Sequence, residues 1–184
     1  ILNEYLLSGG RPAFRARLVL AGTLSPLYSI YSGYELIENV PVREGSEEYM
    51  NSEKYEIRQR DWEAPGNLNP MIQRINRIRR ENPALQRYRN LQFHRSENDQ
   101  ILFYSKTAPD AANYLLMVAN LDPHRPQETM VHVPLDLLGL TEHDPYTVED
   151  LLTGARYTWR GARNFVRLDP HAEQAGHILR LERG

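Results

Sequence analysis

The sequence changes character near Tyr88, and this change limits the possible folds more than any other feature. Before this residue, two stretches carry apolar side chains at helical spacing and are separated by a long polar stretch. After it, short runs of β-forming residues follow one another between turn residues. Closely spaced short strands favour an antiparallel sandwich. We therefore predict an α/β unit over residues 1–88 and an all-β unit over residues 89–184.

The first unit begins with a predicted helix and strand. The helix is expected over Pro12–Thr23, because proline is tolerated in a first helical turn and because Phe14, Leu18 and Ala21 recur at helical spacing. A short buried strand is expected over Leu27–Tyr31, which is rich in β-forming residues. A helix followed directly by a buried strand indicates an α/β unit with a parallel sheet.

A second helix is predicted to begin at Asn69-Pro70 and to end at Asn82-Pro83. Asn69 is a plausible N-cap, because its side-chain oxygen can accept a hydrogen bond from a free backbone N–H in the first turn. Ile72, Ile75 and Ile78 form an apolar stripe, which predicts that this helix packs against a core on one side.

The second unit carries eight predicted strands. Turn signals such as Glu97-Asn98-Asp99 and Thr153-Gly154 separate them. The expected ranges are Leu91–His94, Ile101–Ser105, Tyr114–Asn120, Thr129–Val133, Tyr146–Asp150, Ala155–Trp159, Asn164–Leu168 and His177–Leu181.

Composition excludes several classes of function. The chain has no cysteine, which removes disulfides, zinc–thiolate sites and cysteine nucleophiles. Its net charge of -2 with interspersed signs predicts neither nucleic-acid nor membrane binding. The six histidines show no metal-ligand spacing and are expected to be ordinary surface or strand residues. A cytoplasmic location is compatible with this composition. The start at Ile1, without Met, suggests a fragment of a longer protein.

The polar stretch between the two helices, residues 35–67, has the composition of a sugar-binding loop. Tyrosines offer flat faces for pyranose rings, and carboxylates accept hydrogen bonds from sugar hydroxyls. Glycosidases use two such carboxylates, but nothing in the sequence singles out a pair among four candidates. The candidates are Glu35, Glu38, Asp61 and Glu63.

Several longer motifs carry a resemblance to a known family. They are ILNEYLLSGGRPAFRARLVLAGTLSP, YSGYELIEN, GSEEYMNSEKYEIRQRDW and APGNLNPMIQRINRIRRENPALQ, and together they cover about the first half of the chain. In these motifs the chain resembles the bacterial α-1,4-glucan:maltose-1-phosphate maltosyltransferases of glycoside hydrolase family 13. The resemblance implies that residues 1–88 are the C-terminal end of a (β/α)8 barrel, the last helix–strand–helix, followed by an antiparallel β-sandwich domain.

The resemblance also implies a reaction. Members of the family carry maltosyl units from α-maltose 1-phosphate to an α-1,4-glucan by a retaining double displacement, without a metal or cofactor. The nucleophilic Asp, the acid/base Glu and the stabilising Asp would all lie upstream of Ile1, so no catalytic residue is expected in this chain. The family's donor-binding Lys-Tyr pair matches Lys54 and Tyr55. The resemblance further implies a homodimer of the whole protein, and we expect the isolated chain to be inactive with a poorly packed N-terminal half.

Two alternatives remain open at the level of the sequence. One is another enzyme of the α-amylase superfamily, such as a trehalose-synthase-like protein. The other is a non-catalytic glucan-binding β-sandwich, which a row of exposed aromatic residues would favour. The candidates for such a row are Tyr104, Tyr114, Tyr157 and Trp159.

Overall fold

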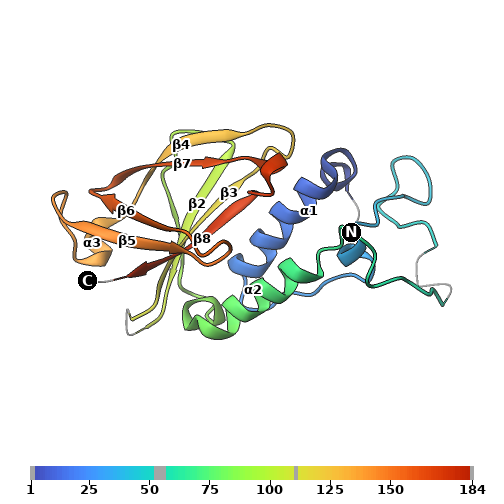
Figure 1. Cartoon of the computed structure of the whole chain (residues 1–184), viewed down its shortest axis with the longest axis horizontal. Helices are drawn as coiled ribbons and strands as arrows, with labels where there is room; N and C mark the ends of the chain where they lie inside the picture. Colours follow the sequence, from blue (N-terminus) through green and yellow to red (C-terminus); the bar gives the residue numbers. More distant parts are fainter. Residues whose placement is uncertain (1–2, 52–56, 110–111, 183–184) are drawn as a thin grey trace.

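A computed structural model of the chain describes residues 3–51, 57–109 and 112–182. These residues form a layered arrangement in which a six-stranded antiparallel sheet lies between a two-stranded sheet and two helices (Figure 1). Strand order in the larger sheet is β1-β2-β3-β8-β5-β6, and the smaller sheet pairs β4 with β7. The strand bounds are β1 Leu91–His94, β2 Ile101–Thr107, β3 Tyr114–Asn120, β4 Gln127–His132, β5 Pro145–Asp150, β6 Arg156–Arg160, β7 Arg163–Leu168 and β8 Gly176–Glu182.

The eight predicted strands are all present within the described ranges, with ends that differ by two residues or fewer. The short helix α3 (Leu135–Leu138) follows β4 and was not predicted, because four residues are too few to show a helical period. The sequence pattern succeeds here because each strand lies between clear turn residues.

Strand β3 is buried along its whole length because it has a core on both faces. Leu116 and Val118 belong to the apolar cluster shared by the two sheets. Leu115 and Met117, which point to the opposite face, belong to the cluster shared with the helices. Alternation of this kind follows from the two-residue period of a strand. The continuous apolar sequence of β3 therefore marks the centre of the molecule.

Helix α1 (Glu4–Leu24) begins earlier than the sequence predicted. Asn3 is its N-cap, and its side chain accepts a hydrogen bond from the Leu6 amide at 3.2 Å. Gly10 has a non-helical backbone (φ 50°, ψ -143°) and divides the helix, so the part beyond it corresponds to the predicted helix at Pro12. Among the helices that the structure describes, none has the length and hydropathy to cross a membrane.

Helix α2 (Asn69–Glu81) is confirmed, but the prediction of Asn69 as its N-cap is wrong by one residue. Leu68 occupies the cap position without a side-chain hydrogen bond. The Asn67 side chain instead accepts a hydrogen bond from the Asn69 amide at 2.9 Å. Asn67 and Asn69 can both accept a hydrogen bond from a backbone N–H near the helix start. Only the backbone geometry decides which of the two does so.

The two helices pack firmly on the larger sheet, so the expected poor packing of the N-terminal half is wrong for them. Val19 of α1 and Ile75 of α2 are fully buried in the cluster that they share with the sheet. Gly22 permits close contact between the helices, because a Cβ there would lie 2.7 Å from the Ile75 side chain. Full burial of one large apolar side chain contributes about 1.5–3 kcal/mol. The sheet of the second unit thus supplies a core for the first.

The predicted strand Leu27–Tyr31 is not a strand in the structure. Leu27 is 83% exposed, and no strand of the described ranges pairs with this segment. Arg79 of α2 holds its start, donating hydrogen bonds to the carbonyls of Ser25 at 3.0 Å and Pro26 at 2.6 Å. A β-forming sequence needs a neighbouring strand for its ladder hydrogen bonds, and this segment has none.

Candidate functional site

Residues 35–51 and 57–67, the described parts of the polar stretch, lie on the far side of the helices from the β-rich part (Figure 1). Lys54 and Tyr55, the predicted donor-binding pair, fall outside the described residues. Asn51 and Ile57 are the described residues on either side of them. The structure therefore shows how the base of this loop is held, and the roles of Lys54 and Tyr55 stay a prediction.

The chain enters the loop through a short antiparallel pairing. The Val42 amide donates to the Glu48 carbonyl at 2.9 Å, and the Met50 amide donates to the Val40 carbonyl at 2.9 Å. Tyr49, between these bonds, is almost fully buried and stacks on Tyr31, with ring centroids 5.0 Å apart and ring planes 12° from parallel. The entrance of the loop is thus fixed against the segment that follows α1.

Glu38 holds the other side of the loop. Its carboxylate accepts hydrogen bonds from Arg60 Nε at 2.9 Å and from Arg58 Nη1 at 3.3 Å. Arg58 also reaches the Met50 carbonyl at 3.4 Å, which joins the exit of the loop to its entrance. Because Glu38 is largely buried, these charge-assisted bonds are poorly screened by solvent. One carboxylate therefore clamps both ends of the stretch that contains Lys54 and Tyr55.

Gly33 makes this clamp possible. Its backbone is left-handed (φ 102°), and a Cβ at this position would lie 2.1 Å from the Glu38 carboxylate. The Gly33 amide donates to the Glu35 side chain at 3.0 Å, and the Glu35 carbonyl accepts from the Leu68 amide at 2.7 Å. Only glycine combines this backbone conformation with the close approach of Glu38.

The four candidate carboxylates do not form a recognisable catalytic pair. Glu38 is ion-paired with two arginines, and Glu35 accepts the Gly33 amide. Asp61 accepts the Glu63 amide at 3.0 Å, which is a turn contact. The contacts of Glu35, Glu38 and Asp61 hold the backbone and the arginines of this stretch, and the location of the catalytic acids stays a prediction.

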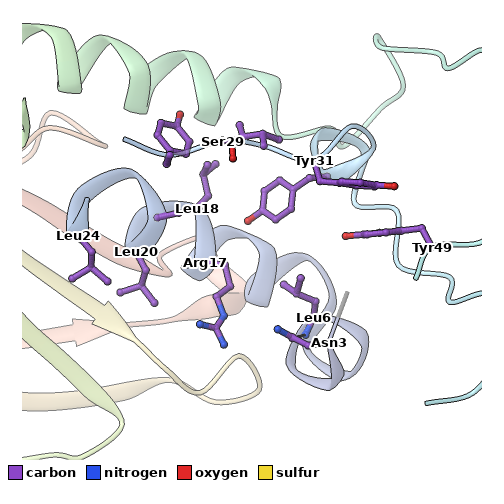
Figure 2. Close-up of a pocket in the computed structure, with 13 residues that line it drawn as sticks. Asn3, Leu6, Arg17, Leu18, Leu20, Leu24, Ser29, Tyr31 and Tyr49 are labelled. Carbon is purple, nitrogen blue, oxygen red and sulfur yellow. Dashed lines mark hydrogen bonds between the residues drawn. The ribbon is translucent and has the colours of Figure 1, made fainter. Parts of the chain in front are cut away.

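A cavity of about 430 Å³ opens between α1 and the segment 28–31. Figure 2 shows the side chains that line it, with Arg17, Leu20 and Leu24 on one wall and the stacked rings of Tyr31 and Tyr49 at one end. Burial is the main reason that the pKa of Tyr49 is raised to about 12, so its hydroxyl keeps its proton at neutral pH. The cavity is mostly apolar, with few groups that could bind a charged ligand.

The side chains of His94 and His177 contact polar groups of neighbouring strand and turn residues. His94 Nε2 lies 2.7 Å from the Ser105 hydroxyl, and His177 Nδ1 lies 3.0 Å from the Asp150 carboxylate. Among residues 3–51, 57–109 and 112–182, no group of three His, Asp or Glu side chains is placed to hold a metal ion.

Comparison with known proteins decides the family. The family model described as "GLGE, C-terminal" matches residues 93–181. Alpha-1,4-glucan:maltose-1-phosphate maltosyltransferase 2 of Streptomyces coelicolor is 51% identical over 187 residues, covering 100% of this chain and 27% of that protein. The maltosyltransferase of Rhodospirillum rubrum is 49% identical over 181 residues, covering 98% of this chain and 26% of that protein.

The chain belongs to the α-1,4-glucan:maltose-1-phosphate maltosyltransferase family. It spans about a quarter of the length of these family members. A noncanonic maltogenic α-amylase, AmyB from Thermotoga neapolitana, has a similar fold, with a TM-score of 0.61 and 12% identity over 92% of this chain and 36% of that one. This structural likeness concerns the fold alone.

The sequence alone does not reveal two features of the site: the ion pairs of Glu38 and the stacking of Tyr31 on Tyr49. In the sequence Glu38 is one of several candidate carboxylates, although Arg58 and Arg60, at alternate positions within the same loop, are a usable signal of opposite charge. Tyr31 and Tyr49 are 18 positions apart, and nothing in their spacing indicates contact.

Proposed function

We propose that this chain is part of an enzyme that transfers maltosyl units from α-maltose 1-phosphate to the non-reducing end of α-1,4-glucans and releases phosphate, as in α-glucan biosynthesis. The observation that carries the proposal is the 51% identity, over the entire chain, with a protein named for that transfer. The relatives reported above are named as maltosyltransferases, which favours this proposal over the rival reading as a trehalose-synthase-like enzyme.

The proposed architecture assigns residues 1–88 to the end of a (β/α)8 barrel and residues 89–184 to a C-terminal β-sandwich domain. In support, the β-forming segment 27–31 has no strand beside it in the described chain and borders an apolar cavity of about 430 Å³. A further barrel strand would pair with this segment and fill the cavity. Substrates of such barrels bind at the carboxyl ends of the strands. The loop 35–67 follows the carboxyl end of segment 27–31, so it would lie on the substrate-binding side of the barrel.

Lys54 and Tyr55 would bind the donor. A lysine ammonium can donate hydrogen bonds to phosphate or sugar hydroxyls, and a tyrosine adds a ring and a hydroxyl. The clamp at Glu38 supports this role, because a loop whose two ends are fixed loses little entropy when it binds a ligand. The carboxylates for a retaining double displacement would come from outside this chain, so the chain alone would not turn over substrate.

The alternative of a stand-alone glucan-binding sandwich is disfavoured. Of the aromatic residues proposed to form an exposed row, Tyr104, Tyr114 and Trp159 are buried in the core, and only Tyr157 is exposed, at 41%. The predicted row of exposed rings is therefore absent among these four residues. The homodimer expected from the family resemblance stays a prediction, which light scattering on the whole protein would test.

The decisive experiment uses a chimera in which this chain replaces the matching quarter of the Streptomyces coelicolor relative. Lys54→Ala should lower kcat/KM for maltose 1-phosphate by roughly 10–100-fold, the value expected for one lost hydrogen bond to a charged group. Arg43→Ala, which removes an exposed cation from the same loop, is the matched control and should change kcat/KM less than twofold. Equal effects of the two substitutions would contradict the assignment of Lys54.

A further inference from the structure

The turn that carries Glu38 is fixed to helix α1. Tyr34, within this turn, donates a hydrogen bond from its hydroxyl to the Phe14 carbonyl, and the centroids of the two rings lie 4.8 Å apart. The Glu38 amide donates to the Gly33 carbonyl at 3.0 Å, which closes the turn. Ile37 is left-handed (φ 57°), a conformation that a β-branched residue keeps only where the surrounding structure determines it. The Glu38 side chain therefore projects from a rigid support.

A cavity of about 300 Å³ separates the entrance of the loop from its exit. Residues 37–40 and 49–51 line it on the entrance side, and Arg58 lines it on the exit side. Because a cavity rather than packed side chains lies between the two ends, the hydrogen bonds of Glu38 to Arg58 and Arg60 set their spacing. The bond from Arg58 to the Met50 carbonyl, at 3.4 Å, crosses the same gap.

The contact between Glu38 and Arg60 fixes an orientation as well as a distance. Arg60 donates from Nε to one carboxylate oxygen at 2.9 Å and from Nη2 to the other at 3.3 Å, which is a bidentate pair. The side chain of Arg60 is 3% exposed, and those of Glu38 and Arg58 are 16% and 33% exposed. One carboxylate thus meets two guanidiniums, and a neutral residue at position 38 would leave both cations without their counter-charge.

We propose that Glu38 is a positioning residue for donor binding, which acts through Arg58 and Arg60 to hold the two ends of the loop where the loop meets the phosphorylated sugar. This inference rests on the proposed transfer function. Residues 52–56 lie outside the described part of the chain, so the argument uses only the residues before and after them. A displacement of about 1 Å in a group that contacts substrate can cost about 100-fold in rate, so the spacing of the two ends matters for the donor.

The test is steady-state kinetics of the chimera with the Streptomyces coelicolor relative, in which maltose 1-phosphate and the glucan are varied separately. Glu38→Gln should raise KM for maltose 1-phosphate by roughly tenfold, the effect expected when a hydrogen bond between charged groups is lost. The values of kcat and of KM for the glucan should stay within about twofold, because only donor binding depends on these two ends. A folding defect would instead lower kcat and leave both KM values unchanged.

The matched control is Glu44→Gln. It removes an exposed carboxylate of the same loop that has no hydrogen bond or ion pair among the described residues, and its kinetics should equal those of the wild type. Arg58→Met breaks the clamp from its more exposed side, and it should raise the same KM as Glu38→Gln does. In the double variant the two effects should combine to less than their product, because both substitutions break one contact.

Three results would overturn the inference. The first is a donor KM that is the same in Glu38→Gln, Glu44→Gln and the wild-type chimera. The second is a lower kcat with unchanged KM in Glu38→Gln, which would assign Glu38 to the stability of the fold alone. If Glu38→Gln does not fold, an unchanged donor KM in Arg58→Met is the third. An inactive wild-type chimera would overturn the proposed function together with this inference, whereas an active chimera with any of these three results overturns this inference alone.

Discussion

Lys106 offers the sharpest test of the packing described above. Its side chain is completely buried on the face of β2 that meets the helices, and its ammonium nitrogen has no hydrogen-bond partner within the described residues. Its cross-strand neighbours are Leu91 and Leu115. Burial, with a smaller contribution from the nearby Arg79, lowers the pKa of Lys106. We predict that Lys106→Met stabilises the chain.

The expected gain in stability equals the desolvation cost that Lys106→Met removes. A buried polar group without a partner costs about 1–3 kcal/mol in mutational data, and methionine fills a similar unbranched volume. For a chain of this size, each kcal/mol shifts Tm by about 2–4 °C, so the substitution should raise Tm by roughly 2–12 °C.

The pH dependence gives a second signature of Lys106. Because its pKa is lower in the folded state, the unfolded chain binds more protons, and the stability of the wild type should rise as the pH approaches the usual lysine pKa of 10.5. The advantage of Lys106→Met should therefore be largest near neutral pH and should narrow toward pH 10.5. Differential scanning calorimetry across that range measures both effects. Arg87→Met, at an exposed position, is the control, and a Lys106→Met chain no more stable than the wild type would refute the reasoning.

Two further substitutions test the positions of the loop and of α1. Gly33→Ala should destabilise the chain by about 1–3 kcal/mol, because the left-handed backbone strains alanine and because the new Cβ displaces Glu38. The control is Gly45→Ala, whose backbone is also left-handed but which has no atom near its Cβ position, so it carries the backbone strain alone. If urea unfolding found equal losses of stability in the two variants, the result would argue against the clamp. Arg79→Met should lower the free energy of unfolding by roughly 1.5–3 kcal/mol, because Arg79 donates hydrogen bonds to carbonyls at the end of α1. Arg80→Met is the control and should change the free energy of unfolding by no more than about 0.5 kcal/mol in the same assay. An unchanged urea midpoint for Arg79→Met would show that those hydrogen bonds are unimportant.

Most of the β-rich part could be predicted because its signals are local. Each strand has its own run of β-forming residues and its own turns, so the pattern does not depend on distant partners. The segment Leu27–Tyr31 shows where this reasoning fails. Its composition is that of a strand, but a ladder needs a second strand, and local propensity says nothing about whether one is present.

The candidate site was less accessible to prediction than the strands. The motif around Lys54 and Tyr55 pointed to the loop, but the loop is anchored by contacts between separate segments. Glu38 meets Arg58 and Arg60 only after the chain has folded back, and Tyr49 meets Tyr31 in the same way. Such contacts depend on tertiary geometry, which spacing along the sequence does not encode.

The central claim is that this chain completes an enzyme whose catalytic carboxylates it lacks. The most direct measurement is phosphate release from maltose 1-phosphate in the presence of an α-1,4-glucan, by the chain alone and by the chimera with the Streptomyces coelicolor relative. We predict release by the chimera and none above background by the chain. Turnover by the isolated chain, or a folded chimera without activity, would contradict the account.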